Sequence, residues 1–160
     1  MAKSQIDVQI DKIGWARLCA PERFVQRIIT AAQEATEPPA DFELSIVLAT
    51  DAAVQRLNRE YRGKDSPTNV LSFPGYEGAP LMPGQRPHLG DIFLAAGTVQ
   101  REAKAQGKTL EQHLAHLLVH GFLHLLGYTH DDDSNARHME EQEKTIMQKL
   151  GFSDPYMQEQ

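Results

Sequence analysis

The sequence predicts an α/β sandwich in which a mixed sheet of about four strands packs against helices. Four short apolar segments are typical of strands, and five segments repeat their apolar residues at helical spacing, in the order β, α, β, α, β, β, α, α, α. A helix between the first two strands allows them to pair in parallel, and a loop between the last two allows them to pair antiparallel. At this length, residues 1–160 are expected to form a single domain.

The first quarter of the chain is predicted to hold a strand, a helix and a second strand. Apolar and polar residues alternate over residues 6–10, which is typical of a half-buried strand. Pro21 suits the first turn of a helix, and Pro38 ends the helical pattern that follows it. Residues 42–50 are mostly apolar and predict a more buried strand.

A second helix follows this strand. Asp51 is expected to cap it, its apolar positions are Val54, Leu57 and Tyr61, and it ends near Gly63. Four basic residues lie on it or just beyond it: Arg56, Arg59, Arg62 and Lys64. Such a cluster is usually a solvated helix face, but it could also be a local basic groove, and both interpretations stay open.

The middle of the chain is predicted to contribute two strands and a short helix. Residues 68–73 and 89–96 have strand-like composition, and residues 98–106 form a short helical segment. Residues 74–88 between the strands are rich in proline and glycine and are interpreted as one surface loop. An interdomain linker is the alternative, but neither flank is large enough to stand alone.

Two further helices complete the predicted fold. Thr109 and Gln112 fit a capping box that opens a long apolar helix, which Gly127 would stop. Asp133 or Ser134 would cap the last helix. The positions at helical spacing in that helix are Ala136, Met139, Glu143, Ile146, Met147 and Leu150.

The composition excludes several classes of protein. Cys19 is the only cysteine, so a disulfide within the chain and a cysteine-rich metal cluster are excluded, and we expect a small, partly buried apolar residue. The start of the chain lacks the apolar core of a signal peptide, and no run of ~18 apolar residues occurs, so we expect a cytoplasmic protein with no membrane partner. The formal net charge of −6 counts against holding nucleic acid by bulk charge.

Histidines follow one edge of the long helix. At roughly 100° per residue, His113, His116, His120 and His124 fall within an arc of roughly 80°. His120 and His124 are four residues apart and can reach one metal ion, and His130 returns just past the glycine that ends the helix. The central helix is therefore expected to bind a metal through His120, His124 and His130, with a fourth position left open as in catalytic zinc sites.

The choice of ligands and metal has alternatives. His116 paired with His120 is a rival, but no third ligand is evident for that pair. His113 and His116 are assigned to packing or to supporting the ligands, and His88 and His138 to the surface. One Zn²⁺ ion is the first choice of cofactor, although other divalent transition metals also suit three imidazoles.

The spacing of these three histidines is that of the metzincin proteases, except that Gly121 replaces their catalytic glutamate. Peptide cleavage needs a proton for a poor leaving group, so this loss weakens a peptidase interpretation. A phosphodiester needs its phosphate oxygens stabilised, which a metal ion and an arginine can do. Arg62 is the candidate arginine, and Asp131 or another nearby carboxylate is the candidate base.

Three segments resemble the YbeY family of rRNA maturation factors: LNREYRGKDSPTNVLSFP (57–74), LGDIFLA (89–95) and HLLVHGFLHLLGYTHDDD (116–133). The likeness extends from about Leu44 to Tyr156. It implies a single-strand-specific, zinc-dependent endoribonuclease acting in 16S rRNA 3′-end maturation and ribosome quality control. The implied partners are single-stranded ribosomal RNA, the small ribosomal subunit and ribosome-associated proteins.

The resemblance also implies roles for individual residues. The implied metal ligands are His120, His124 and His130. Arg62, in the Y-R-G-K segment, and His120 are assigned to catalysis. Many relatives have an aspartate where this chain has Thr129, so Asp131 is a candidate to replace that carboxylate.

Two other functions stay open at this point. A zinc peptidase-like metallohydrolase fits the ligand spacing but not Gly121, and cleavage of peptide against single-stranded RNA would distinguish it. A ribosome assembly factor with a mainly structural metal would tolerate Arg62→Ala but unfold without the metal. Because no aromatic RNA-recognition motif occurs, the RNA substrate rests on the resemblance and on the local basic segment.

Overall fold

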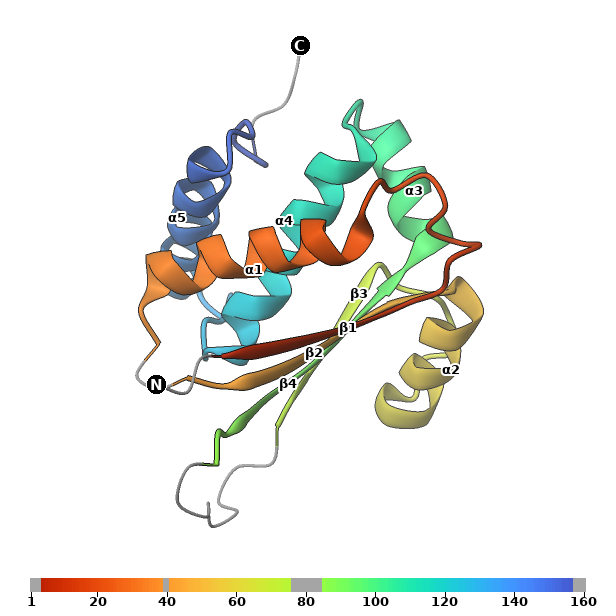
Figure 1. Ribbon diagram of the computed structural model, residues 1–160, viewed down its shortest axis with the longest axis horizontal. Helices are drawn as coiled ribbons and strands as arrows, with labels where there is room; N and C mark the ends of the chain where they lie inside the picture. The colour runs from red at the N-terminus through yellow and green to blue at the C-terminus, as the bar shows by residue number, and fades with distance from the viewer. Residues whose placement is uncertain (1–3, 39–40, 76–84, 157–160) are drawn as a thin grey trace.

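The computed structural model of the chain describes residues 4–38, 41–75 and 85–156, and Figure 1 shows the arrangement of their helices and strands. Their order along the chain is the predicted one. The elements are β1 (Gln5–Ile10), α1 (Pro21–Thr36), β2 (Glu43–Ala49), α2 (Asp51–Arg62), β3 (Val70–Pro74), β4 (His88–Ala95), α3 (Ala96–Ala105), α4 (Leu110–Leu125) and α5 (Asp133–Lys149).

The four strands form one mixed sheet in the order β1-β2-β4-β3. β1 pairs in parallel with β2, and β2 in parallel with β4, whereas β3 runs antiparallel to β4. The predicted α/β sandwich is confirmed, including the parallel pair around the first helix and the antiparallel pair across the predicted loop. β3 lies at the edge of the sheet and contacts α4.

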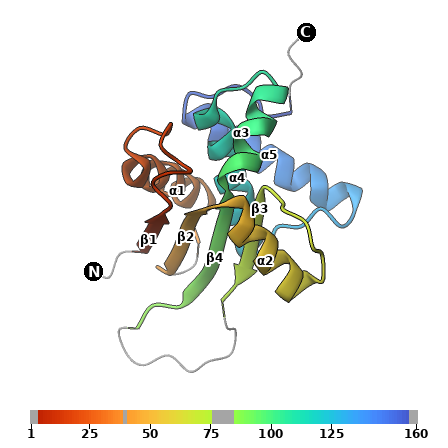
Figure 2. The same ribbon diagram turned by 90° about the vertical axis from the view of Figure 1, so that its right-hand side faces the viewer.

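The helices cover the two faces of the sheet unequally (Figures 1 and 2). α1 and α4 lie over one face with α5 packed on their outer side, while α2 lies on the other face against β3 and β4. Because strand side chains alternate between faces, Ile46 and Ile92 are buried in the core with α4, whereas Phe73 and Phe93 pack with α2. α4 is the central helix, with contacts to α1, α3, α5 and two strands.

The start of α2 differs from the prediction. Thr50, not Asp51, is the N-cap, because Thr50 has the extended backbone that a cap needs and its side chain accepts a hydrogen bond from the Ala53 N–H at 3.1 Å. The Asp51 carboxylate instead accepts hydrogen bonds from the Thr98 N–H and from Arg101, both at 2.9 Å. Asp51 therefore ties α2 to α3.

The ends of α4 and α5 follow the prediction more closely. Thr109 caps α4 and accepts a hydrogen bond from the Gln112 N–H at 3.1 Å. The Gln112 side chain does not complete a capping box, because it donates to Ser153 at 2.7 Å. Asp132 caps α5, one residue before the predicted Asp133.

Three smaller expectations are corrected or left aside. Tyr61 is 69% exposed and contacts Phe73 at its edge of the sheet, so it is not a core position of α2. Cys19 is exposed rather than partly buried. Most of the predicted loop 74–88 lies outside the described residues. Among the helices described, none has the length and apolar character needed to cross a membrane.

Candidate metal centre

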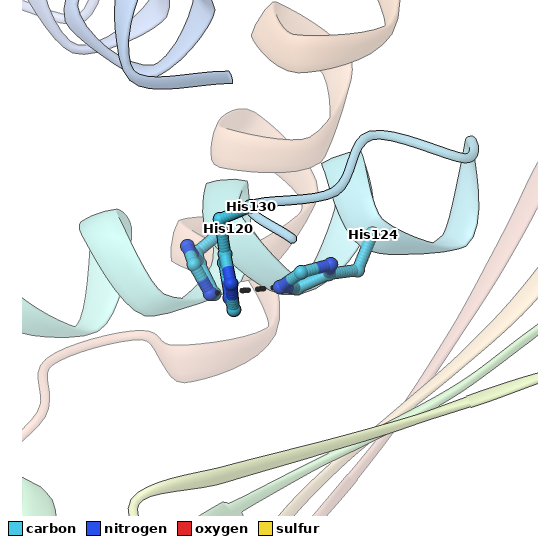
Figure 3. Close-up of side chains that lie close together, drawn as sticks. All are labelled: His120, His124 and His130. Atoms are coloured by element: carbon cyan, nitrogen blue, oxygen red, sulfur yellow. Dashed lines mark hydrogen bonds between the residues drawn. The ribbon is translucent and has the colours of Figure 1, made fainter. Parts of the chain in front are cut away.

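The structure brings His120, His124 and His130 together, as their spacing predicts (Figure 3). One ring nitrogen from each lies within 4.8 Å of the others. The first two project from α4. Gly127 has φ 101°, a conformation that favours glycine, and it turns the chain so that His130 returns to the helix. His130 is exposed, so the cluster opens to solvent.

The hydrogen bonds of the two helical histidines fix where their lone pairs lie. His120 Nδ1 donates to the Glu143 carboxylate at 2.6 Å, and His124 Nδ1 donates to the Tyr128 carbonyl at 3.0 Å. Each ring therefore keeps its lone pair on Nε2, and the two Nε2 atoms face each other at 3.0 Å. Burial and the nearby His120 lower the pKa of His124, which keeps it neutral.

This donor set fits a divalent transition metal. Two lone pairs at this separation repel each other unless a cation lies between them, and zinc binds imidazole nitrogens at about 2.0–2.1 Å. A carboxylate or carbonyl behind each ligating ring is the usual support of a histidine metal site. His120, His124 and His130 therefore have both the chemistry and the orientation of metal ligands.

Glu143 on α5 is the buried support of this centre. Its side chain is fully buried and accepts hydrogen bonds from His120, from His116 Nε2 at 3.1 Å and from the Tyr156 hydroxyl. Burial alone would raise its pKa, but the hydrogen bonds from His116, His120 and Tyr156 lower it to about 2. Burial and the bond to Glu143 raise the pKa of Tyr156, so the phenol stays protonated and donates.

His116, His120 and Glu143 form a second group that could hold a metal. The His116–His120 pair, for which no third ligand is evident in the sequence, gains a possible one in the fold, because Glu143 lies beside both histidines. Its oxygens, however, already accept three hydrogen bonds and are closed off from solvent. The three-histidine group has free lone pairs and an open side, so it is the better metal site.

Glu143→Gln is expected to weaken zinc binding by about 10–100-fold, the usual effect of removing the partner of a metal-binding histidine. The amide keeps the size of the carboxylate but loses its charge and one of its two acceptors. Competition with a coloured chelator measures the affinity. Glu141→Gln, at an exposed position of the same helix, should bind zinc as the wild type does; equal affinities in both variants would contradict this role.

A cavity of about 410 Å³ opens beside the three histidines, and we call it the histidine cavity. Arg62, at the end of α2, and Ser72, on β3, also line it. Of the four clustered basic residues, Arg62 is the one in this lining. Within the described ranges no carboxylate pairs with Arg62, whereas Arg59 lies 3.8 Å from Asp65. Arg62 therefore shares one cavity with the three histidines.

Asp131, the candidate base, is not in this lining. It accepts hydrogen bonds from Asn135 at 3.0 Å and from the Thr129 hydroxyl at 2.7 Å, and these bonds lower its pKa. None of the described residues that line the histidine cavity is an aspartate or glutamate. The structure therefore gives no support to Asp131 as the base.

Gly121 lies where α4 presses on the sheet. A Cβ at this position would be 2.9 Å from Ser72 Oγ and 3.2 Å from Ile92 Cγ2. A glutamate here would be directed at these two side chains, in a buried position. Glycine therefore permits the close contact of α4 with β3 and β4 that builds the cavity.

Gly121→Glu is expected to lower the free energy of unfolding by at least about 3 kcal/mol, because it overpacks the helix–sheet contact and buries a carboxylate. It should not create peptide cleavage. Urea denaturation measures the change, and Ala105→Glu, at an exposed position of α3, serves as the control. A stable Gly121→Glu protein that cleaves peptides would contradict this explanation.

A family sequence model described as Endoribonuclease YbeY matches residues 6–151, which is most of the chain. The chain belongs to the YbeY family. Membership confirms the resemblance found in the sequence and agrees with the expectation of an endoribonuclease, a hydrolase. It also counts against the peptidase alternative.

The sequences of individual YbeY relatives are similar to this chain over most of their length. The Endoribonuclease YbeY of Paramagnetospirillum magneticum is 57% identical over 121 residues, 74% of each chain. That of Chelativorans sp. (strain BNC1) is 44% identical over 151 residues, 94% of this chain and 92% of the relative. The solution structure of TM1509 from Thermotoga maritima matches with a TM-score of 0.60 over 96% of this chain and 99% of that one, at 24% identity, and so shares the fold.

Proposed function

We propose that this YbeY-family endoribonuclease cleaves single-stranded RNA with one Zn²⁺ ion held by His120, His124 and His130 and with Arg62 assisting. The observation that carries the proposal is one cavity lined by three convergent imidazoles and a guanidinium without a carboxylate partner in the described chain. Phosphodiester hydrolysis needs charge stabilised on phosphate oxygens, and this pairing provides it. Residues 1–160 would act as one catalytic domain.

The zinc ion, when bound, supplies Lewis-acid stabilisation of charge on the phosphate. Glu143 and the Tyr128 carbonyl bond the Nδ1 atoms of the two helical histidines, which leaves each Nε2 free to bind the ion. Arg62 can donate two parallel N–H groups to the non-bridging phosphate oxygens. His120 is assigned to catalysis because it would bind the ion while its other nitrogen bonds the buried Glu143.

The cellular role that we propose is 16S rRNA 3′-end maturation and ribosome quality control, in the cytoplasm. Its support is the long resemblance of the segments at 57–74, 89–95 and 116–133 to rRNA maturation factors. The substrate would be single-stranded ribosomal RNA. The partners would be the small ribosomal subunit and ribosome-associated proteins.

Cleavage of labelled substrates by the purified protein tests this function. Single-stranded RNA should be cut, duplex RNA and peptides should not, a chelator should stop the reaction, and added zinc should restore it. Full RNA cleavage by metal-stripped protein would contradict the metal role. Zinc-dependent cleavage of peptides instead of RNA would contradict the substrate.

A further inference from the structure

A second and larger cavity adjoins the histidine cavity, and we call it the lateral cavity. Its volume is about 690 Å³, within the range of about 300–1,000 Å³ typical of small-ligand sites. Asn69, Val70 and His120 line both cavities, so the two form one groove. Arg62 lies in the histidine half of this groove and Lys108 in the lateral half.

Among the residues that the structure describes, none lining the groove is acidic, although the chain as a whole is acidic. The sequence has 22 aspartates and glutamates against 16 lysines and arginines, yet none of the described lining residues is acidic. Glu102 and Glu143 are outside the lining and accept hydrogen bonds from two lining histidines, His113 at 2.8 Å and His116 at 3.1 Å. Lys108 carries a positive charge in the lining that an anionic group can contact, while these two carboxylates lie behind the lining and are occupied by hydrogen bonds.

His113 is a buried residue in the wall of the lateral cavity. His113 is 4% exposed and its Nε2 donates to the Glu102 carboxylate, so its Nδ1 is an acceptor. Burial lowers the pKa of His113, which favours the neutral ring. Within the described ranges no group bonds this Nδ1. This nitrogen has almost no solvent-accessible surface, so it belongs to the wall of the cavity and is not counted among the groups that contact a ligand.

One wall of the lateral cavity is formed by Ser153, Pro155 and Tyr156, and hydrogen bonds hold this segment in place. Lys108 donates to the Pro155 carbonyl at 2.9 Å and keeps two further N–H groups. Tyr156 is held by its hydroxyl on Glu143, and its ring meets His116 edge-on at 5.4 Å. Since Tyr156 is 43% exposed, a fixed aromatic ring is available for a base to stack on.

We propose that the lateral cavity binds the nucleotide next to the scissile phosphate of single-stranded RNA, with Lys108 on its outer phosphate and Tyr156 stacking on its base. The proposal rests on the proposed function, which places the scissile phosphate in the histidine cavity. Lysine binds phosphate through a charged hydrogen bond, and an aromatic ring stacks on any base. Adjacent subsites of one groove then hold consecutive groups of one strand.

The test compares the zinc-loaded wild type with Lys108→Ala on a short single-stranded RNA and on two versions shortened by one nucleotide, at the 5′ or the 3′ end of the cleavage site. Lys108→Ala should lower kcat/KM on the full substrate roughly tenfold, the effect of one hydrogen bond to a charged group. On one shortened RNA the variant and the wild type should be equal, because the nucleotide that Lys108 contacts is absent.

Three further variants distinguish the loss of an RNA contact from a change in the structure of the cavity wall. Lys104→Ala removes an exposed lysine outside the lining and should behave as the wild type. Lys108→Arg keeps the charge and should retain most of the activity. Lys144→Ala removes the ion pair with Asp154 at 3.6 Å, outside the lining, and tests whether loosening the wall accounts for the loss. A Lys144→Ala loss as large as that of Lys108→Ala would overturn the proposal.

The remaining outcomes are also decisive. If the wild type cleaves RNA and Lys108→Ala matches Lys104→Ala on all three RNAs, the nucleotide site is wrong while the endoribonuclease function stands. If the wild type cleaves no RNA, the proposed function fails. RNA binding, measured by fluorescence anisotropy with the same RNA, then tests the lateral cavity independently of cleavage. Weaker binding by Lys108→Ala, with a salt dependence reduced by about 0.7 in slope, would then support the site, and unchanged binding would overturn it.

Discussion

Arg62→Ala is expected to lower kcat/KM for single-stranded RNA cleavage by about 10²–10³-fold while one zinc ion per chain stays bound. The guanidinium lines the histidine cavity, so its loss removes stabilisation of the phosphate. It is not one of the groups that could hold the metal, so zinc content should not change. Cleavage kinetics and elemental analysis of the same preparation measure the two effects.

Arg59→Ala is the matched control for this prediction. It removes the same charge from the same helix, but Arg59 is exposed, faces Asp65 and is outside the lining of the histidine cavity. Its activity should stay within about twofold of the wild type, as for most exposed positions. Equal losses of activity in both variants would mean that cleavage depends on the total positive charge of α2 and not on the position of Arg62. A fully active Arg62→Ala protein would favour an assembly factor with a structural metal.

His124→Ala is expected to remove zinc and activity together. Removing a ligand should weaken zinc binding by more than the roughly 10–100-fold lost when only the hydrogen-bond partner of a ligand is removed. The fold should persist, because α4 is held by buried apolar residues such as Leu118 and Phe122. Zinc content, RNA cleavage and circular dichroism of one sample test the three parts of this expectation.

His88→Ala is the control for the loss of a histidine. His88 is exposed on β4, as predicted for a surface residue, and it lies 3.4 Å from Asp91. Its variant should keep both zinc and activity. A His124→Ala protein that retains one zinc ion and cleaves RNA normally would show that the zinc is bound elsewhere.

The fold could be predicted from the sequence because its signals are local. Alternation over residues 6–10 and helical spacing in the long helix depend on neighbours along the chain, and both were confirmed. The clustering of the three histidines could also be predicted, since residues four apart share a helix face and Gly127 turns the chain back toward the helix. Helix caps shifted by one residue at Thr50 and Asp132, because a cap depends on backbone angles that composition alone does not fix.

The support of the metal centre could not be predicted in the same way. Glu143 is separated from His120 by 23 residues and meets it only because α5 packs on α4. A signal was present, since Glu143 falls among apolar positions of its helix, and a buried carboxylate needs partners. The sequence did not identify those partners, and Tyr156 joins them from beyond the helix. The lateral cavity likewise depends on how α4 and residues 153–156 come together.

X-ray absorption spectroscopy of the zinc-loaded wild-type protein tests the metal centre most directly, because it counts the imidazoles around the ion. We expect three imidazole nitrogens at about 2.0–2.1 Å and one further light atom. Two imidazoles with a carboxylate would place the ion at His116, His120 and Glu143. That result would contradict the centre built from His120, His124 and His130.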